Sequence, residues 1–262
     1  MSNVESNVEL TRESAPPDLA EEWTPPLPPT DLIFDDGEPL ESNRHRIAMN
    51  VLIEGIHQAY RGRDDYFCGG NMFVYYSSEQ VRNREFKGPD FFVTLNVDGT
   101  KERQGWVVWE EAGRYPDAIV ELMSPSTAKQ DTGKKKDLYE RTFKTRDYFV
   151  YDPFDKHSLQ GWHLSGNSCY EKIVPDDRGW LWCESLELWL GIWSGTLTKE
   201  KANWLRFFDR DGNIILLSQE LADRERERAE QERERAERAE SELAQLRDRL
   251  QDMGIDPDRL SE

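Results

Sequence analysis

Ala118-Ile-Val-Glu-Leu-Met123 is the stretch of sequence that decides the fold, because it places one carboxylate inside an otherwise apolar run. Its β-branched and aliphatic side chains are typical of a buried strand. A charged side chain is rare in such a strand unless it is paired or bound, since burying a lone charge is costly. Glu121 therefore needs a partner. Strand alternation places Asp117 and Met123 on the same face as Glu121.

The sequence on both sides of this strand predicts more strands and two helices. Phe91–Leu95 has the composition of a strand, and residues 128–143 have helical spacing with Leu138 and Phe143 facing inward. An earlier helix, which Ser42 can cap, has the inward-facing residues Ile47, Val51, Ile56 and Tyr60. Strands are also predicted over 72–76, 148–152, 159–164, 169–174, 186–190 and 214–217. Helices flanking a mixed sheet make the predicted fold class α/β.

The two ends of the chain differ from its middle in composition. Residues 1–30 are proline-rich, with six acids and one base, and predict a disordered leader. Residues 31–217 are the expected folded domain. Residues 218–262 begin with Arg-Glu repeats and predict a helix with a weak coiled-coil seam, followed by a tail. The large apolar residues of that seam, spaced 3-4-3, are Leu243, Leu246, Leu250 and Met253.

Composition also excludes several classes of protein. The longest apolar run is far below the roughly 20 residues that a membrane span needs, and the first residues do not resemble a signal peptide. We therefore expect a cytoplasmic protein without a membrane partner. Cys68, Cys169 and Cys183 are odd in number and form no CxxC pair, so the sequence suggests neither a zinc ribbon nor a disulfide framework, and we expect buried thiols. The net charge of −18 argues against indiscriminate nucleic-acid binding.

A second carboxylate has a setting similar to that of Glu121. Asp90 directly follows Gly88-Pro89 and opens the strand Phe91–Leu95. Two carboxylates at strand ends can converge in a sheet. Mg²⁺ is held by one or two carboxylates and completes its coordination with waters and substrate phosphate oxygens, so sparse acidic ligation fits phosphodiester chemistry.

Three consecutive lysines lie early in the helix predicted after Glu121. Successive helical residues point about 100° apart, so only one of the residues 134–136 can face the sheet. Asp131, Lys135 and Tyr139 are spaced by four and share one stripe. From the residues alone, the more common structural interpretations stay open: Glu121 pairs with a lysine of this helix, and the lysine triplet is a solvated face.

Taken in order, these motifs resemble the Uma-type putative restriction endonucleases, small members of the PD-(D/E)XK nuclease superfamily. The matching motifs are Gly-Pro-Asp90, Glu121-Leu-Met-Ser-Pro-Ser126, Asp131-x-x-x-Lys135 and Tyr151-Asp-Pro153. The resemblance runs from about Leu32 to Leu217. It implies a restriction-endonuclease-like sheet and a DNA endonuclease that depends on Mg²⁺ or Mn²⁺.

The resemblance also implies roles for particular residues. Asp90 and Glu121 would be the metal ligands, and Lys135 would orient or activate the attacking water. The usual third residue of the superfamily would be Met123, which cannot do this, so Lys135 on the next helix is the substitute. Nucleases that cut both strands commonly act in pairs, which together with the seam predicts a dimer formed through the coiled coil or the nuclease domain.

Three further residues are supporting candidates. Glu41, with His45 one turn later, resembles an acid on the first core helix that supports the metal site, although an exposed helix start explains the pair equally well. Asp117 lies too near Glu121 to be the family's first acid and is kept as an outer supporting residue. Tyr139 shares the stripe of Lys135. Ser126 or Thr127 more simply caps the following helix than acts as a nucleophile.

Two functional hypotheses remain open at this point. The first is a metal-dependent DNA endonuclease, which the ordered motifs favour. The second is a nuclease-fold protein that no longer cleaves and acts as a binding or assembly module through its coiled coil, which the acidic charge and the long terminal helix favour.

Overall fold

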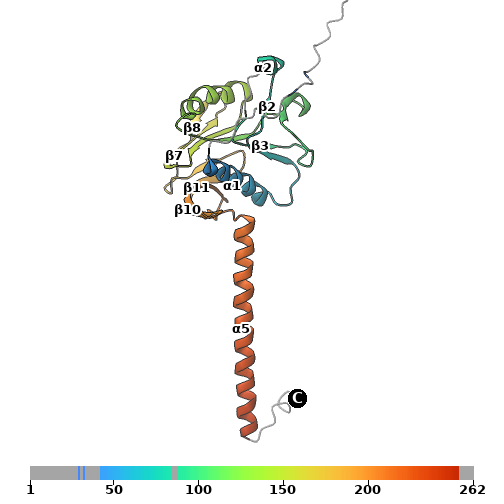
Figure 1. Cartoon of the computed structure of the whole chain (residues 1–262), viewed down its shortest axis with the longest axis vertical. Helices are drawn as coiled ribbons and strands as arrows, with labels where there is room; N and C mark the ends of the chain where they lie inside the picture. The colour runs from blue at the N-terminus through green and yellow to red at the C-terminus, as the bar shows by residue number, and fades with distance from the viewer. Residues whose placement is uncertain (1–28, 30–31, 33–41, 84–87, 254–262) are drawn as a thin grey trace, which may run out of the picture.

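Six strands form one mixed sheet in the order β1-β3-β5-β6-β7-β8. The bounds of these strands are Tyr66–Gly69, Phe91–Leu95, Ala118–Leu122, Asp147–Asp152, Asp155–Leu164 and Tyr170–Lys172, in that order. The computed structural model describes residues 29, 32, 42–83 and 88–253 (Figure 1). Apart from Pro29, the predicted leader over residues 1–30 lies outside the described residues. The mixed sheet flanked by helices confirms the predicted fold class.

The centre of this sheet is the parallel pair β5 and β6, in which Glu121 lies opposite Val150. All five residues of β5 are buried. Parallel neighbours need a long crossover, and here a helical segment between residues 128 and 143 provides it. Its successive parts are α3 (Ala128–Gln130), η2 (Asp131–Lys135), α4 (Lys136–Leu138) and η3 (Tyr139–Phe143).

The crossover segment has the predicted bounds but not the predicted regular geometry, because η2 and η3 are π-helical. Periodicity in a sequence does not reveal a switch to i→i+5 hydrogen bonds, which π turns use and which are frequent near functional sites. Lys144 adopts a left-handed backbone conformation with φ 55° and ends the segment.

Each face of the sheet packs against its own core. On one face lies α1 (Asn43–Ala59), capped by Ser42 as predicted. It packs with a second sheet of order β11-β10-β9. The strands of that sheet are β9 (Leu181–Cys183), β10 (Leu188–Leu197) and β11 (Glu200–Phe208). On the other face the crossover segment packs Tyr139 and Phe143 over Ile119 and Tyr148. Val120 and Leu122 belong to the first core, so Glu121 points toward the crossover segment.

The remaining elements are small. A parallel two-stranded ladder joins β2 (Val74–Tyr75) to β4 (Trp106–Val107). Between and after these strands lie α2 (Ser78–Asn83) and the short η1 (Val108–Glu110).

Several predicted strands differ from the structure. The strand over 72–76 shrinks to β2, which pairs with β4 outside the six-stranded sheet. The strand over 186–190 begins at Leu188 and continues to Leu197. The prediction of a strand over 214–217 is wrong, because Ile214 forms only an isolated bridge to Phe208. The prediction of buried thiols was also wrong for Cys169, which is exposed, and Cys68 is only half-buried.

The last described element, α5 (Ser218–Asp252), is a 35-residue helix that projects away from the rest of the chain (Figure 1). The first turn of α5, around Ser218 and Glu220, is here called its root. Arg206 of β11 holds it in place, because this buried side chain donates two hydrogen bonds to Glu220, at 2.7 and 3.1 Å. Gln58 of α1 also donates to the Ser218 hydroxyl at 2.7 Å. Across the described part of the chain, no helix is both long and apolar enough to cross a membrane.

The buried pair at the root of α5 generates a stability prediction. Arg206→Met removes the guanidinium that donates to Glu220 and to the carbonyl of Ile215, and should lower the free energy of unfolding by about 2 kcal/mol. Arg210→Met is the matched control, because the Arg210–Glu187 pair is exposed on both sides and should contribute under about 0.5 kcal/mol. Urea unfolding of both variants measures the difference, and equal losses would contradict this role of Arg206.

Candidate active site

Glu121 is fully buried near the end of β5, and its side chain points at the crossover segment. One carboxylate oxygen, Oε2, accepts a hydrogen bond from Lys135 Nζ at 3.0 Å. The other, Oε1, accepts one from the Tyr139 hydroxyl at 2.7 Å. The structural interpretation left open by the sequence, an ion pair with a lysine of the next helix, is therefore present in the fold.

Asp90 lies beside Glu121 because β3 runs antiparallel to β5, with Phe91 opposite Val120. The Asp90 carboxylate accepts a hydrogen bond from the backbone N–H of Leu122 at 2.8 Å. Its own backbone N–H donates to Glu121 Oε2 at 3.4 Å. The side chain is half-buried, so solvent reaches this edge of the site. The fold thus brings the two predicted acids together at one end of β5.

A third carboxylate, Asp131, completes the cluster from the first turn of η2. It is buried, and its Oδ1 lies 2.9 Å from Lys135 Nζ. The Tyr148 hydroxyl donates to the carbonyl of Asp131 at 2.7 Å and fixes this turn over the sheet. The Lys135 ammonium consequently lies between Glu121 and Asp131, as the shared stripe of the sequence predicts. The neighbouring Lys134 is exposed.

The cluster has more negative than positive groups. Three carboxylates share one ammonium, with little water to screen them. Burial, together with the nearby Asp90 and against the opposing effect of Lys135, raises the pKa of Glu121 to about 7. Burial likewise raises the pKa of Asp90 and of Asp131. Burial alone would lower the pKa of Lys135, but the Glu121 and Asp131 carboxylates raise it above its usual value, so the ammonium stays charged.

This donor set fits a divalent cation. Its excess negative charge and its hard oxygen atoms suit Mg²⁺ or Mn²⁺. Asp131 Oδ1 is buried and has no hydrogen bond of good geometry, although it lies 2.9 Å from Lys135 Nζ. Within the described residues, however, no group of three or more His, Cys, Asp or Glu side chains is arranged to hold a metal ion. A cation bound here would therefore be held by few protein oxygens and would keep coordination positions for water and a phosphate.

The first turn of α1 lies at the same end of β5. His45 is buried, and its Nε2 lies 3.2 Å from the carbonyl oxygen of Met123, the residue that follows the strand. Its Nδ1 lies 2.8 Å from the Ser42 hydroxyl. Glu41, the predicted supporting acid, precedes this turn and lies outside the described residues.

Asp117 lies at the opposite end of β5. Its Oδ2 accepts a hydrogen bond from the backbone N–H of Leu95 at 2.8 Å and contacts Arg114 Nη2 at 3.4 Å. Glu121 lies four positions further along the extended chain, a distance of roughly 13 Å. These contacts join β3 to β5 and give Asp117 a structural explanation that does not involve the acid cluster.

The turn after β5 also differs in detail from its prediction. The Ser124 hydroxyl, rather than that of Ser126 or Thr127, accepts hydrogen bonds from the backbone N–H groups that follow, each at 3.2 Å. The Thr127 hydroxyl instead accepts one from the N–H of Ser124 at 3.0 Å. This serine-rich turn leads the chain directly from Glu121 into the crossover segment.

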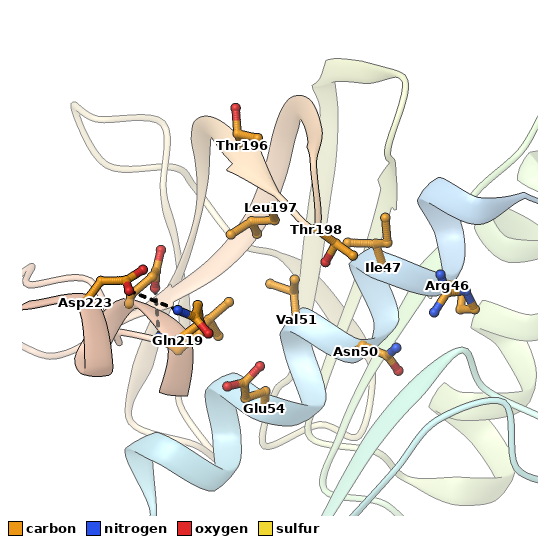
Figure 2. Close-up of a pocket in the computed structure, with 12 residues that line it drawn as sticks. Arg46, Ile47, Asn50, Val51, Glu54, Thr196, Leu197, Thr198, Gln219 and Asp223 are labelled. Atoms are coloured by element: carbon orange, nitrogen blue, oxygen red, sulfur yellow. Dashed lines mark hydrogen bonds between the residues drawn. The ribbon is translucent and has the colours of Figure 1, made fainter.

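A pocket of about 430 Å³ lies elsewhere, between α1, the turn joining β10 to β11 and the root of α5 (Figure 2). Its lining includes the apolar Val51 and Leu197 and the charged Arg46, Glu54 and Asp223. None of the clustered acids or Lys135 lines it. The pocket is therefore separate from the Glu121 cluster.

The sequence predicts that Asp131 shares a helical stripe with Lys135, but the predicted site does not include Asp131. The signal that could have done so was the four-residue spacing in Asp131-x-x-x-Lys135, which allows an ion pair along a helix. The contact between His45 and Met123 had no such local signal, because 78 residues separate the two.

Residues 21–198, more than half of the chain, match the family model "Uma2: Putative restriction endonuclease". No curated protein matches. Among solved structures, one similar chain is described as "a putative nuclease belonging to DUF820" from Anabaena variabilis ATCC 29413. It is 14% identical with a TM-score of 0.40, and the match covers 61% of this chain and 86% of that one.

The raised pKa of Glu121 generates a prediction about stability and pH. The folded chain holds this proton more tightly than the unfolded chain, so Glu121 favours folding most below its ordinary pKa of 4.5. That contribution, on the order of 1–3 kcal/mol, is lost as the pH rises to about 7. Glu121→Gln should remove this part of the decline, so the variant gains stability relative to the wild type between these pH values.

Chemical unfolding across this pH range measures the effect. Glu171→Gln, which changes an exposed glutamate of β8, is the matched control and should keep the wild-type slope. A Glu121→Gln slope equal to that of the wild type would show that the buried carboxylate does not titrate as inferred.

Proposed function

Because the chain belongs to the Uma2 putative restriction endonuclease family, we propose that it is a divalent-metal-dependent DNA endonuclease of the PD-(D/E)XK kind. The observation that carries the proposal is the meeting of Asp90, Glu121 and Lys135 at one end of β5. The three groups come from two strands and a helix that are distant in sequence. The reaction is the hydrolysis of a phosphodiester bond.

The roles of these residues follow from their positions. Asp90 and Glu121 would hold Mg²⁺ or Mn²⁺, which when bound makes a water more acidic and neutralises charge on a phosphate. Lys135 can hold the attacking water or a phosphate oxygen, because its ammonium is charged and partly exposed. Tyr139 orients Glu121, and Asp131 orients Lys135. Glu41 remains a proposed supporting acid.

The net charge of −18 does not prevent DNA binding if the bases are gathered near the site. Residues 128–146, which include the crossover segment, contain seven Lys or Arg and three Asp or Glu. Several of these bases are exposed: Lys129, Lys134, Arg141, Lys144 and Arg146. Because affinity for a phosphate backbone comes mainly from such side chains, this segment supports DNA as the partner.

A second candidate function is a nuclease-fold module that does not cleave. It is favoured by the ion pairs that Lys135 makes with two of the three acids, since a lysine that permanently occupies this position would satisfy them without a metal. The 35-residue α5 would then be the functional element, as an assembly helix.

DNA cleavage by variants of the cluster tests the proposal. With Mg²⁺ or Mn²⁺, the wild type should nick or linearise supercoiled DNA, and Asp90→Ala, Glu121→Ala and Lys135→Ala should each lose about 100-fold or more in rate. Lys172→Ala is the matched control, because this exposed lysine of β8 lies outside residues 128–146 and makes none of the contacts of Lys135 with the acids. Its cleavage rate should stay within about threefold of the wild-type rate.

The outcome that contradicts the proposal is also specific. If the folded wild type cuts no DNA with either ion, the nuclease assignment fails. If the ions in addition leave its melting temperature unchanged, no bound cation stabilises the folded state, and the module becomes the better account.

A further inference from the structure

The far end of α5 exposes apolar side chains. Leu243 is 53% exposed, Leu246 58% and Met253 73%, and the large exposed hydrophobic residues of the described chain are otherwise Phe154 and Val174. The contacts described for the root of α5 come from α1 and β11. Apolar residues repeated at a 3-4 spacing on one helix are the mark of a surface that another helix covers.

The residue types at the seam positions differ between the two halves of the helix. Its positions, spaced alternately by three and four, are Ala222, Glu225, Ala229, Glu232, Ala236, Ala239, Leu243, Leu246, Leu250 and Met253. The first half, residues 222–235, has two glutamates and two alanines on the seam. The second half, residues 236–253, has six apolar residues. Only the second half can bury a continuous apolar stripe without enclosing a carboxylate.

The charges beside the seam change in the same way. In the first half, the positions flanking the seam are Arg226, Arg228, Arg233 and Arg235, all of one sign. Two such halves side by side would therefore face arginine with arginine. In the second half the flanking positions are Glu240, Glu242, Arg247 and Arg249, of both signs. Antiparallel helices would pair Glu240 with Arg247, and parallel helices would pair Glu242 with Arg247.

The first half instead satisfies its own charges. Ion pairs within this half join Arg226 to Asp223 and Arg228 to Glu232. Two more pairs cross its end and join Arg233 to Glu237 and Arg238 to Glu234. Pairs three or four residues apart stabilise a single helix in water. Residues 222–235 therefore need no partner, and at 1.5 Å per residue they span roughly 20 Å.

From these observations we propose that residues 236–253 of α5 pair with the same segment of a second copy of the chain, while residues 222–235 remain an unpaired spacer helix. A second copy of the same segment is the expected partner, because the flanking charges of the segment complement one another and its apolar stripe can pack against an identical stripe. The spacer holds the pairing segment away from the Glu121 cluster, so the pairing does not depend on the proposed nuclease function. Glu225 and Glu232 oppose pairing closer to the root.

Sedimentation of the full chain over a concentration series tests the proposal. The wild type should form a reversible dimer, and Leu246→Ala, which removes apolar surface from both copies, should raise its dissociation constant about tenfold or more. Ala229→Gln is the matched control at a seam position of the spacer. Deletion of residues 226–232, one full heptad, is a second control. Both controls should stay within about twofold of the wild type.

Three outcomes would overturn the proposal. The wild type could remain monomeric throughout the series. Leu246→Ala could dimerise as tightly as the wild type, which would place the interface on another surface. The two spacer variants could weaken the dimer as much as Leu246→Ala does, which would mean that pairing runs the full length of α5. Circular dichroism of each variant checks that the folded part and the helix are retained.

Discussion

The burial of a carboxylate in the central strand is the constraint on which the rest of the structure depends. Glu121 has no exposed surface, so it needs groups that compensate its charge. The crossover between β5 and β6 supplies them, because Lys135 and Tyr139 both donate to Glu121 from that segment. The parallel pairing of β5 and β6 requires a crossover segment, and that segment places the Lys135 ammonium beside Glu121.

Compensation is incomplete, and that is what distinguishes the cluster from an ordinary buried ion pair. Asp90 and Asp131 add two carboxylates around the one ammonium, and burial raises the pKa of all three acids. A protein that needed only stability would be better served by fewer charges there. Retained negative charge at a partly open edge is useful when a divalent cation is to be bound. Under the proposed function, the exposed bases of residues 128–146 would receive the phosphate backbone of DNA.

Much of this arrangement was predictable from local sequence. The apolar runs of β3 and β5 and the spacing of Ile47, Val51 and Ile56 in α1 are strong signals, and the order of Asp90, Glu121 and Lys135 pointed to one site. The strands β1 and β11 were missed because Tyr66–Gly69 is short and Glu200–Phe208 begins with polar residues. The π turns were not predictable, because the spacing of apolar residues does not reveal a switch to i→i+5 hydrogen bonds. The contact of His45 with Met123 was not predictable, because the two residues are distant in the chain.

Anomalous diffraction from crystals grown with Mn²⁺ tests the central claim most directly, since it locates the ion independently of any activity. The account predicts an Mn²⁺ ion held by the Asp90 and Glu121 carboxylates, with Lys135 drawn off Glu121 but still facing the site. Mn²⁺ absent from this cluster at saturating concentration, with Lys135 still bonded to Glu121, would contradict it and leave the cluster as a structural ion-pair network.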